Sequence, residues 1–313
     1  MKTIDVTKKK PRINNALLGI MFIEGEMLVF AIQDSAIKLL SADFSVWQVV
    51  FIRSVLSVFL LGTYVWWMRG LASLYTRNLR GNLLRASLMF VSHILYYLSI
   101  ASLPLATAVA INFAAPLFIV LLARPILGER VGRTRTIAVS IGFVGVVIMV
   151  RPGADIEIGA LFALGAAFTY SLVILSTRHL SQTEPADRIA FYSMLIFALW
   201  GALGGAIVAW LDLPLSDHPG IRYLLLDWSM PGIQSAALLL LIGITAAVGH
   251  LCFAYAYQHA PASLLAPFEY SALIMAGTLG YLIWGDVPDL PMIIGAVIVV
   301  SSGVYLARAE RVI

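Results

Sequence analysis

The sequence predicts an all-α polytopic membrane protein: ten transmembrane helices that form two inverted five-helix repeats. Two observations carry this prediction, an extreme apolar composition and a stretch of chain that occurs twice. Of the 313 residues, 60% are hydrophobic and 12% are charged, and the mean hydropathy is +0.91. A soluble domain of this length would lack the polar surface to cover itself. We therefore expect lipid to solvate the chain.

The repeated stretch covers residues 93–130 and returns in the second half. The matched pairs lie 157 positions apart: His93 and His250, Pro104 and Pro261, Gly128 and Gly285, Glu129 and Asp286. The front parts of the halves match at a shift of 140: Gly19 and Gly159, Phe22 and Phe162, Lys38 and Arg178, Ser41 and Ser181. Residues 211–233 would hold the 17 extra positions of the second half. Self-similarity of this kind indicates an internal duplication.

Ten apolar stretches are long enough to cross the hydrocarbon core, which takes about 20 residues of helix. They are residues 16–40, 45–68, 82–102, 105–124, 133–150, 157–180, 188–211, 234–257, 262–283 and 291–308. Short connections at 102–104 and 258–261 predict antiparallel neighbours, and 212–233 is the long loop. An odd number of spans per half inverts the second half relative to the first. Such repeats place a site near the membrane midplane.

The distribution of Lys and Arg predicts the orientation. Seventeen of these residues fall on the side that holds the N-terminus, and only Arg151 and Arg222 fall on the other. By the positive-inside rule both termini are cytoplasmic, and we expect a multi-pass protein of a bacterial inner membrane. The predicted units are a basic N-terminal tail (1–15), a first repeat (16–151), a second repeat (156–308) and a C-terminal tail (309–313).

Several classes of function find no support in the residues. The single Cys252 allows no disulfide within one chain, and no Cys/His cluster has metal-ligand spacing. No Gly-rich phosphate loop with a following Lys is present, so ATP-driven pumping is unsupported. The basic residues are spread over loops, which argues against a nucleic-acid partner. We expect no cofactor and no metal; the expected partners are a small-molecule substrate and the lipid bilayer, with monomer and homodimer both open.

Three local motifs resemble a known family. They are Leu79-Arg80-Gly81 at the entry to the third helix, Pro116-Leu117-Phe118 followed by 127–130, and the glycine-rich fifth helix ending at 151–153. Together they resemble the drug/metabolite transporter superfamily, EamA branch, over residues 16–308. The resemblance implies secondary transport of small organic solutes by alternating access, through a cavity lined by helices 1, 3, 4, 6, 8 and 9. Members of the branch handle amino acids, nucleosides, S-adenosylmethionine, riboflavin and drugs.

Glu269 is the main candidate for a functional intramembrane group. It lies seven residues into the ninth predicted helix, roughly 10 Å deep at 1.5 Å per residue, and burying a carboxylate there is costly. It could bind a cationic moiety or take up a proton, or it could be a structural carboxylate. Asn112 is its counterpart in the first repeat. Pro116 and Pro267 are the predicted hinges, because proline loosens the preceding turn.

Other intramembrane charges have structural alternatives. Glu24 and Glu26 point about 200° apart around the first helix, so only one of them is expected to face the cavity; which one stays open, and Glu24 is kept as a candidate for substrate binding or coupling. Arg53 could pair with a substrate carboxylate or with an acid of the first helix. The spacing of Asp34 and Lys38 suits an ion pair within the helix.

Two histidines and three tyrosines complete the candidate set for substrate binding or coupling. His93 and His250 hold matched positions and could relay protons or make interhelical hydrogen bonds. Tyr96, Tyr97 and Tyr257 could stack on a heterocyclic or cationic ligand, although packing explains them equally well.

The sequence therefore predicts a secondary transporter for an amino-acid-like, S-adenosylmethionine-like or riboflavin-like metabolite, not an enzyme, with proton coupling and direction left open. The alternatives are a channel-like facilitator, an exporter of drugs or metabolites, and a lipid-handling membrane protein.

Overall fold

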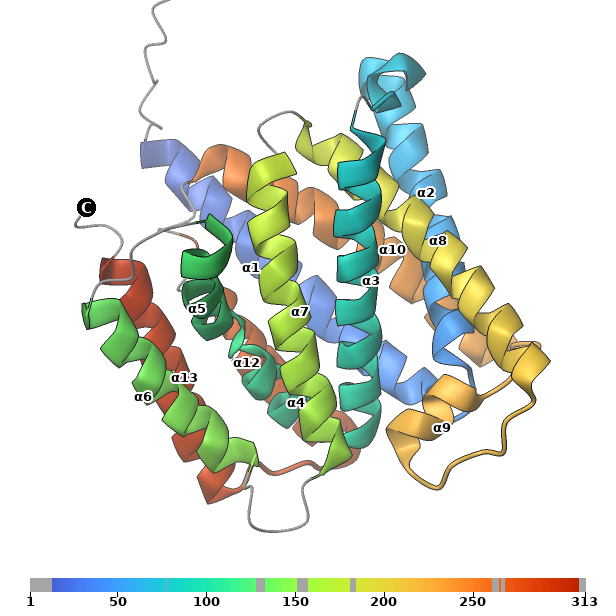
Figure 1. Ribbon diagram of the computed structural model, residues 1–313. Coiled ribbons are helices and arrows are strands. Elements are labelled where there is room, and N and C mark those ends of the chain that lie inside the picture. Colours follow the sequence, from blue (N-terminus) through green and yellow to red (C-terminus); the bar gives the residue numbers. More distant parts are fainter. Residues whose placement is uncertain are drawn as a thin grey trace, which may run out of the picture.

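The computed structural model describes residues 13–76, 78–127, 133–150, 157–180, 184–260, 265 and 268–309. The described residues are mainly helical, with no strand among them, so the all-α prediction is confirmed. The helices are α1 (Ile13–Leu40), α2 (Val46–Arg69), the 3₁₀ helix η1 (Leu71–Leu74), α3 (Leu79–Ser102), α4 (Leu105–Asn112), α5 (Ala115–Leu127), α6 (Arg133–Val150), α7 (Ile158–Leu180), α8 (Ala186–Leu211), α9 (Pro219–Leu225), α10 (Ile233–His259), α12 (Ser271–Trp284) and α13 (Leu290–Ala309) (Figure 1).

Six segments of the described chain are long and apolar enough to cross a membrane: 46–68, 79–102, 105–122, 158–177, 187–211 and 233–253. Three shorter apolar helices, at 137–150, 271–284 and 290–305, accompany them. The long helix α1 carries Glu24, Glu26, Asp34 and Lys38. A helix with this many ionisable groups is unfavourable as a lipid-facing span. Helix α1 lies among other helices (Figure 1).

Three predicted segments differ from the structure. The ninth span was expected as one helix over 262–283, but the helix is interrupted at Tyr270 and α12 begins at Ser271. The fourth span was expected as one helix over 105–124, but the chain breaks between α4 and α5. The loop expected over 212–233 contains α9, which begins at Pro219 in the first helical turn, where a missing N–H costs no hydrogen bond. Most other helix ends lie within three residues of the predicted ones. The predicted tails fall largely at 1–12 and 310–313, outside the described residues.

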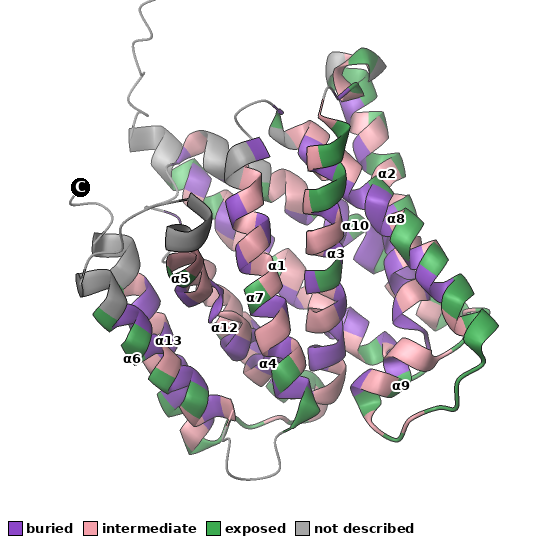
Figure 2. Cartoon of the chain, in the orientation of Figure 1, coloured by how far each residue is buried: buried purple, intermediate pink, exposed green. Residues whose placement is uncertain are grey.

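The largest helix contacts join the two halves of the chain. Helix α1 packs along α10, α3 along α7, α2 against α8, and α6 against α13. Figure 2 shows buried positions where these helices face one another and exposed positions on the outer faces. The exposed apolar side chains include Phe59, Trp66 and Trp67 on α2. Apolar outer surfaces with Trp near a helix end are typical of lipid-facing helices.

Glycine allows the backbones of α6 and α13 to approach closely. A Cβ atom on Gly145 would lie 2.8 Å from the carbonyl oxygen of Gly295, and one on Gly295 would lie 2.6 Å from that of Gly145. Small residues let membrane helices pack backbone to backbone. At Gly277 in α12, by contrast, the nearest neighbour of a Cβ atom would be 3.9 Å away.

We predict opposite effects of alanine at these two positions. Gly145→Ala forces α6 and α13 apart, and overpacking of this kind costs about 1–3 kcal/mol. Gly277→Ala meets open space and gains roughly 0.5–1 kcal/mol of helix stability. Thermal unfolding of the two purified variants in detergent checks this. A Gly145→Ala protein at least as stable as Gly277→Ala would contradict the close approach.

Candidate functional site

The break in the fourth span follows from Pro116. Proline has no N–H to donate to the carbonyl four residues earlier, and its ring clashes with that carbonyl, here Asn112. Helix α4 accordingly ends at Asn112 and α5 begins at Ala115. Between them the Ala114 N–H donates to the Ile111 oxygen at 2.9 Å, which is the tighter three-residue turn. The Asn112 side-chain oxygen is buried and makes no hydrogen bond with the described residues.

A second break lies at the matched place in the other half. Tyr270 immediately precedes α12 and follows Phe113 by 157 positions, as Glu269 follows Asn112. The rings of Phe113 and Tyr270 contact each other with centroids 5.0 Å apart. The hydroxyl of Tyr270 lies against α13 at Gly303, where a side chain would collide with it. Pro267 lies outside the described residues, so its predicted hinge role stays a prediction. The two breaks thus meet inside the molecule.

Two carboxylates lie near the second break. Glu26 on α1 is 4% exposed, and its Oε2 has no hydrogen bond among the described residues. Glu269 is its electrostatic neighbour, and the charges of both act on Tyr170 of α7. Ile23 packs with Leu265, and Phe22, Met27 and Phe268 border the same cluster, which brings α1 to the segment before the break. Two like charges in a low-dielectric interior repel unless a cation or proton joins them.

The two acids of α1, between which the sequence left the choice open, differ in burial and in their acidic neighbour. Glu26 is buried, whereas Glu24 is half-buried. The electrostatic neighbour of Glu269 on α1 is Glu26. Sequence periodicity could not decide this, because α1 is apolar on every side apart from its charges.

Arg53 lies fully buried on α2, with its guanidinium 5.7 Å from the centre of the Tyr97 ring. Its Nε and Nη1 have no hydrogen-bond partner among the described residues. Its acidic neighbour is Asp34 of α1, whose Oδ2 accepts a 2.7 Å hydrogen bond from the Tyr96 hydroxyl. Asp34 is thus the first-helix acid whose charge acts on Arg53, but the two form no ion pair or hydrogen bond among the described residues, and the expected pairing stays a prediction. The expected ion pair of Asp34 with Lys38 does not form, because Asp34 accepts a hydrogen bond from Tyr96 of α3 and Lys38 contacts Asp286, which follows α12.

The two matched histidines make the same hydrogen bond. Nδ1 of His93 contacts the Met89 carbonyl at 2.9 Å, and Nδ1 of His250 contacts the Ala246 carbonyl at 2.7 Å. A carbonyl only accepts, so each Nδ1 donates, and Nε2 of a neutral ring remains an acceptor. Both rings are half-buried. Each histidine is thus anchored within its own helix rather than between helices. The side chain of Tyr257 lies outside the described part of the chain.

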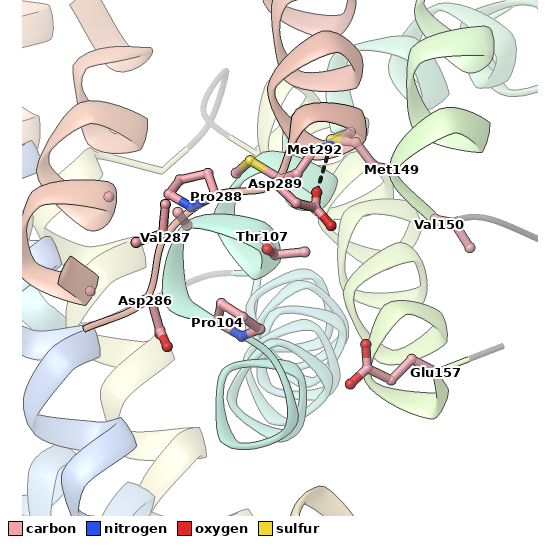
Figure 3. A pocket seen from close by; sticks show the side chains of 13 residues that line it. Pro104, Thr107, Met149, Val150, Glu157, Asp286, Val287, Pro288, Asp289 and Met292 are labelled. Carbon is pink, nitrogen blue, oxygen red and sulfur yellow. Dashed lines mark hydrogen bonds between the residues drawn. The ribbon is translucent and has the colours of Figure 1, made fainter. Parts of the chain in front are cut away.

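A cavity of about 290 Å³ opens at the end of the bundle where α13 begins. Figure 3 shows its acidic lining, Glu157, Asp286 and Asp289, beside Pro104 and Thr107. Oδ1 of Asp289 accepts the N–H of Met292 at 3.0 Å, which caps α13. None of the predicted site residues lines this cavity. The cavity is therefore separate from the carboxylates of Glu26 and Glu269.

Comparison with known proteins identifies the family. The model of the EamA-like transporter family matches residues 17–151 and again 157–308. The chain belongs to the EamA-like transporter family. This membership, together with the six spans and bacterial relatives, supports a multi-pass inner-membrane protein that transports rather than catalyses.

Relatives of this EamA-like chain are named for different substrates. A riboflavin transporter of Vibrio cholerae is 27% identical over 302 residues, which is 95% of each chain. An S-adenosylmethionine uptake transporter of Rickettsia prowazekii is 25% identical, covering 94% of each chain. A pseudopaline exporter of Pseudomonas aeruginosa is 23% identical, covering 94% of this chain and 97% of its own. One solved crystal structure, 17% identical, shares the fold with a TM-score of 0.60 over 96% of this chain and 99% of its own.

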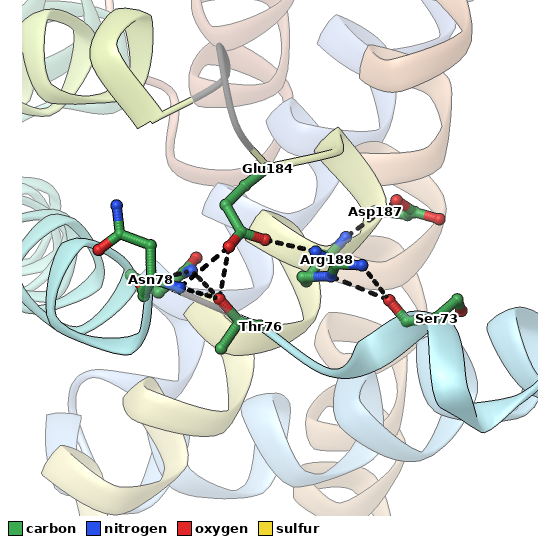
Figure 4. A network of polar contacts seen from close by, with 7 residues as sticks. Ser73, Thr76, Asn78, Glu184, Asp187 and Arg188 are labelled. Atoms are coloured by element: carbon green, nitrogen blue, oxygen red, sulfur yellow. Dashed lines mark hydrogen bonds and ion pairs between the residues drawn. The ribbon is translucent and has the colours of Figure 1, made fainter.

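A polar network ties the α2–α3 connection of this EamA-like chain to the start of α8 (Figure 4). The Thr76 hydroxyl donates to Oε1 of Glu184 at 2.6 Å, and the Asn78 N–H donates to the same oxygen at 3.3 Å. Arg188 donates to Oε2 at 2.7 Å and, through Nε and Nη2, to the Ser73 carbonyl. Burial alone would raise the pKa of Glu184, but the hydrogen bonds from Thr76, Arg188 and Asn78 outweigh it and hold the pKa below its ordinary value.

Sequence reasoning missed Tyr170, Glu184 and the partner of Lys38. Glu184 and Arg188 have the i, i+4 spacing of a helical ion pair, which was a usable signal. Tyr170 and the contact of Lys38 with Asp286 depend on segments far apart in the chain, and no spacing rule finds them.

The Glu184 network predicts a pH dependence of stability. Because the folded-state pKa lies below the unfolded value, the carboxylate stabilises the fold above its ordinary titration range, and this contribution is lost as the pH falls through the folded pKa. We expect the melting temperature of purified protein to fall between about pH 6 and pH 3. At the upper pH, the melting temperature of Glu184→Gln should be lower than that of the unchanged protein. It should also fall less as the pH decreases over this range. An equally steep fall in the variant would assign the acid sensitivity to other groups.

Proposed function

We propose that this chain is a secondary transporter that moves a small organic metabolite bearing a positive group across the inner membrane by alternating access. The observation that carries the proposal is a pair of neighbouring carboxylates beside the break that precedes α12: Glu26, which is buried, and Glu269, which is half-buried. A carboxylate in a membrane interior is costly, and Oε2 of Glu26 makes no hydrogen bond among the described residues. A cationic substrate group, or a proton, removes that cost when it binds between the two acids.

Two inverted five-helix repeats, over residues 16–151 and 156–308, would provide the alternating access. The packing of α1 with α10 has its counterpart in that of α7 with α3, as expected when two halves exchange roles. The two helix breaks lie 157 positions apart and contact each other. Broken helices at a repeat interface are typical of secondary transporters, whose repeats rock around a central site. We place both termini on the cytoplasmic side from the Lys and Arg distribution.

Within the site we assign complementary roles to the remaining residues. Glu26 and Glu269 receive the positive group or a coupling proton. Asn112, the counterpart of Glu269, offers its buried side-chain oxygen from the other break. His93 and His250 offer Nε2 acceptors. Tyr96, Tyr97 and Tyr257 supply aromatic surface for a heterocycle. Relatives named for riboflavin and S-adenosylmethionine transport make such solutes the first to test.

Counterflow in proteoliposomes tests this function. Radiolabelled S-adenosylmethionine, riboflavin and amino acids are offered to vesicles preloaded with the same unlabelled solute. We expect saturable exchange that preloading accelerates, for a solute with a positive group. Flux that neither saturates nor responds to preloading would contradict a carrier and favour the channel-like facilitator. Lipid scrambling without solute exchange would favour the lipid-handling alternative.

Charge removal tests the site. Loss of a charge-assisted contact is worth about 1.5–3 kcal/mol, so Glu269→Gln and Glu26→Gln should each reduce exchange of the cationic solute by roughly 10-fold or more. Glu24→Gln, two residues from Glu26 on the same helix, is the matched control and also tests the role first expected for Glu24. An effect of Glu24→Gln equal to that of Glu26→Gln would contradict the assignment of the pair.

A further inference from the structure

The ammonium of Lys38 makes three contacts near the C-terminal end of α1. Its Nζ donates to the Leu103 carbonyl at 2.8 Å, lies 3.5 Å from Oδ2 of Asp286, and sits 4.7 Å from the centre of the Trp284 ring. The side chain is 14% exposed and that of Asp286 27%. A mostly shielded ion pair with an added charge-assisted hydrogen bond is stronger than an exposed surface pair.

The three partners come from two parts of the chain. Lys38 and Leu103 belong to the first family match, whereas Trp284 and Asp286 belong to the second. Leu103 follows α3, and residues 285–289 connect α12 to α13. One side chain therefore joins the two halves at the end of the bundle that also holds the acidic cavity. Asp286 lines that cavity as well (Figure 3).

Local sequence presents both oxygen atoms to Lys38. Leu103 precedes Pro104, which holds it in an extended conformation with ψ 160°, so its carbonyl leaves the helical ladder. Gly285 ends α12 with φ +71°, a left-handed conformation that glycine adopts without strain. The turn places the N–H of Asp286 on the Gly280 oxygen at 3.3 Å, and the carboxylate of Asp286 then reaches Lys38.

The residues next in the chain to the contact are apolar and buried. Ile37 and Leu105 are fully buried and Leu103 is 2% exposed. Such side chains stay out of water as long as the neighbouring contact holds the two halves together. The contact can also be undone, because a paired ammonium and carboxylate at partial exposure regain hydration when they part.

We propose that Lys38, Asp286 and the Leu103 carbonyl form a clasp that keeps this end of the protein closed, and that opening this end breaks the clasp. This clasp is a part of the alternating access in the proposed function. By the Lys and Arg distribution it lies on the outer side of the membrane. It assigns Lys38 and Asp286 to gating rather than to solute binding.

Cysteine protection measures the clasp without any solute. In a Cys252→Ser background, Leu105→Cys provides a thiol buried behind the clasp, and a hydrophilic maleimide reports its exposure in lipid nanodiscs, where both faces are accessible. We expect slow labelling with the clasp intact. Lys38→Gln and Asp286→Asn should each raise the labelling rate by roughly 10-fold, the population change expected when a charge-assisted hydrogen bond is lost.

The controls separate opening of the clasp from general loosening. Arg222→Gln removes an exposed cation outside the clasp and should leave the labelling rate unchanged, and a thiol at the exposed Val287 should label equally fast in all backgrounds. The double variant should label no faster than either single one, because both changes break one contact. Unchanged protection in Lys38→Gln, or equal acceleration in Arg222→Gln, overturns the proposal. The labelling assay uses no solute, whereas counterflow depends on the choice of solute. Counterflow can therefore fail while the labelling result holds, so the clasp and the proposed function are tested separately.

Discussion

The fold depends on one constraint: a bilayer interior offers no water to a polar group, so each such group needs a partner within the protein. The histidine Nδ1 atoms meet it through carbonyls of their own helices. Asp34 meets it through Tyr96, and Lys38 through a carbonyl and a carboxylate. Against this background the buried groups that make no hydrogen bond among the described residues, such as Oε2 of Glu26, carry the functional interpretation.

The helix breaks determine where those polar groups lie. A continuous helix satisfies its own carbonyls and presents only side chains to its neighbours. Breaking α4 from α5, and the chain before α12, brings Phe113 against Tyr270 and sets Asn112 and Glu269 beside the two breaks. The first break follows from Pro116. Leu273 stands at the position matched to Pro116, so the second half reaches the same geometry with a different sequence.

The sequence predicted an all-helical chain and most of its helix ends, because lipid requires long apolar helices and the chain shows them plainly. It did not predict the break at Phe113, since proline in a membrane helix leaves the place and size of the distortion to the packing around it. Nor could it choose between Glu24 and Glu26, because a helix that is apolar on all sides has no periodic signal for its inner face. The contact of Lys38 with Asp286 joins residues 248 positions apart, and only the fold brings them together.

The most direct test of the central claim is a thermal-shift screen of purified protein against cationic, zwitterionic, anionic and neutral heterocyclic metabolites. A ligand that binds the folded state alone raises the melting temperature as it saturates its site. The neighbouring carboxylates of Glu26 and Glu269 predict stabilisation by solutes with a positive group, and loss of that stabilisation in a protein lacking the Glu26 charge. Stabilisation by anionic solutes alone, unchanged without that charge, would contradict the account.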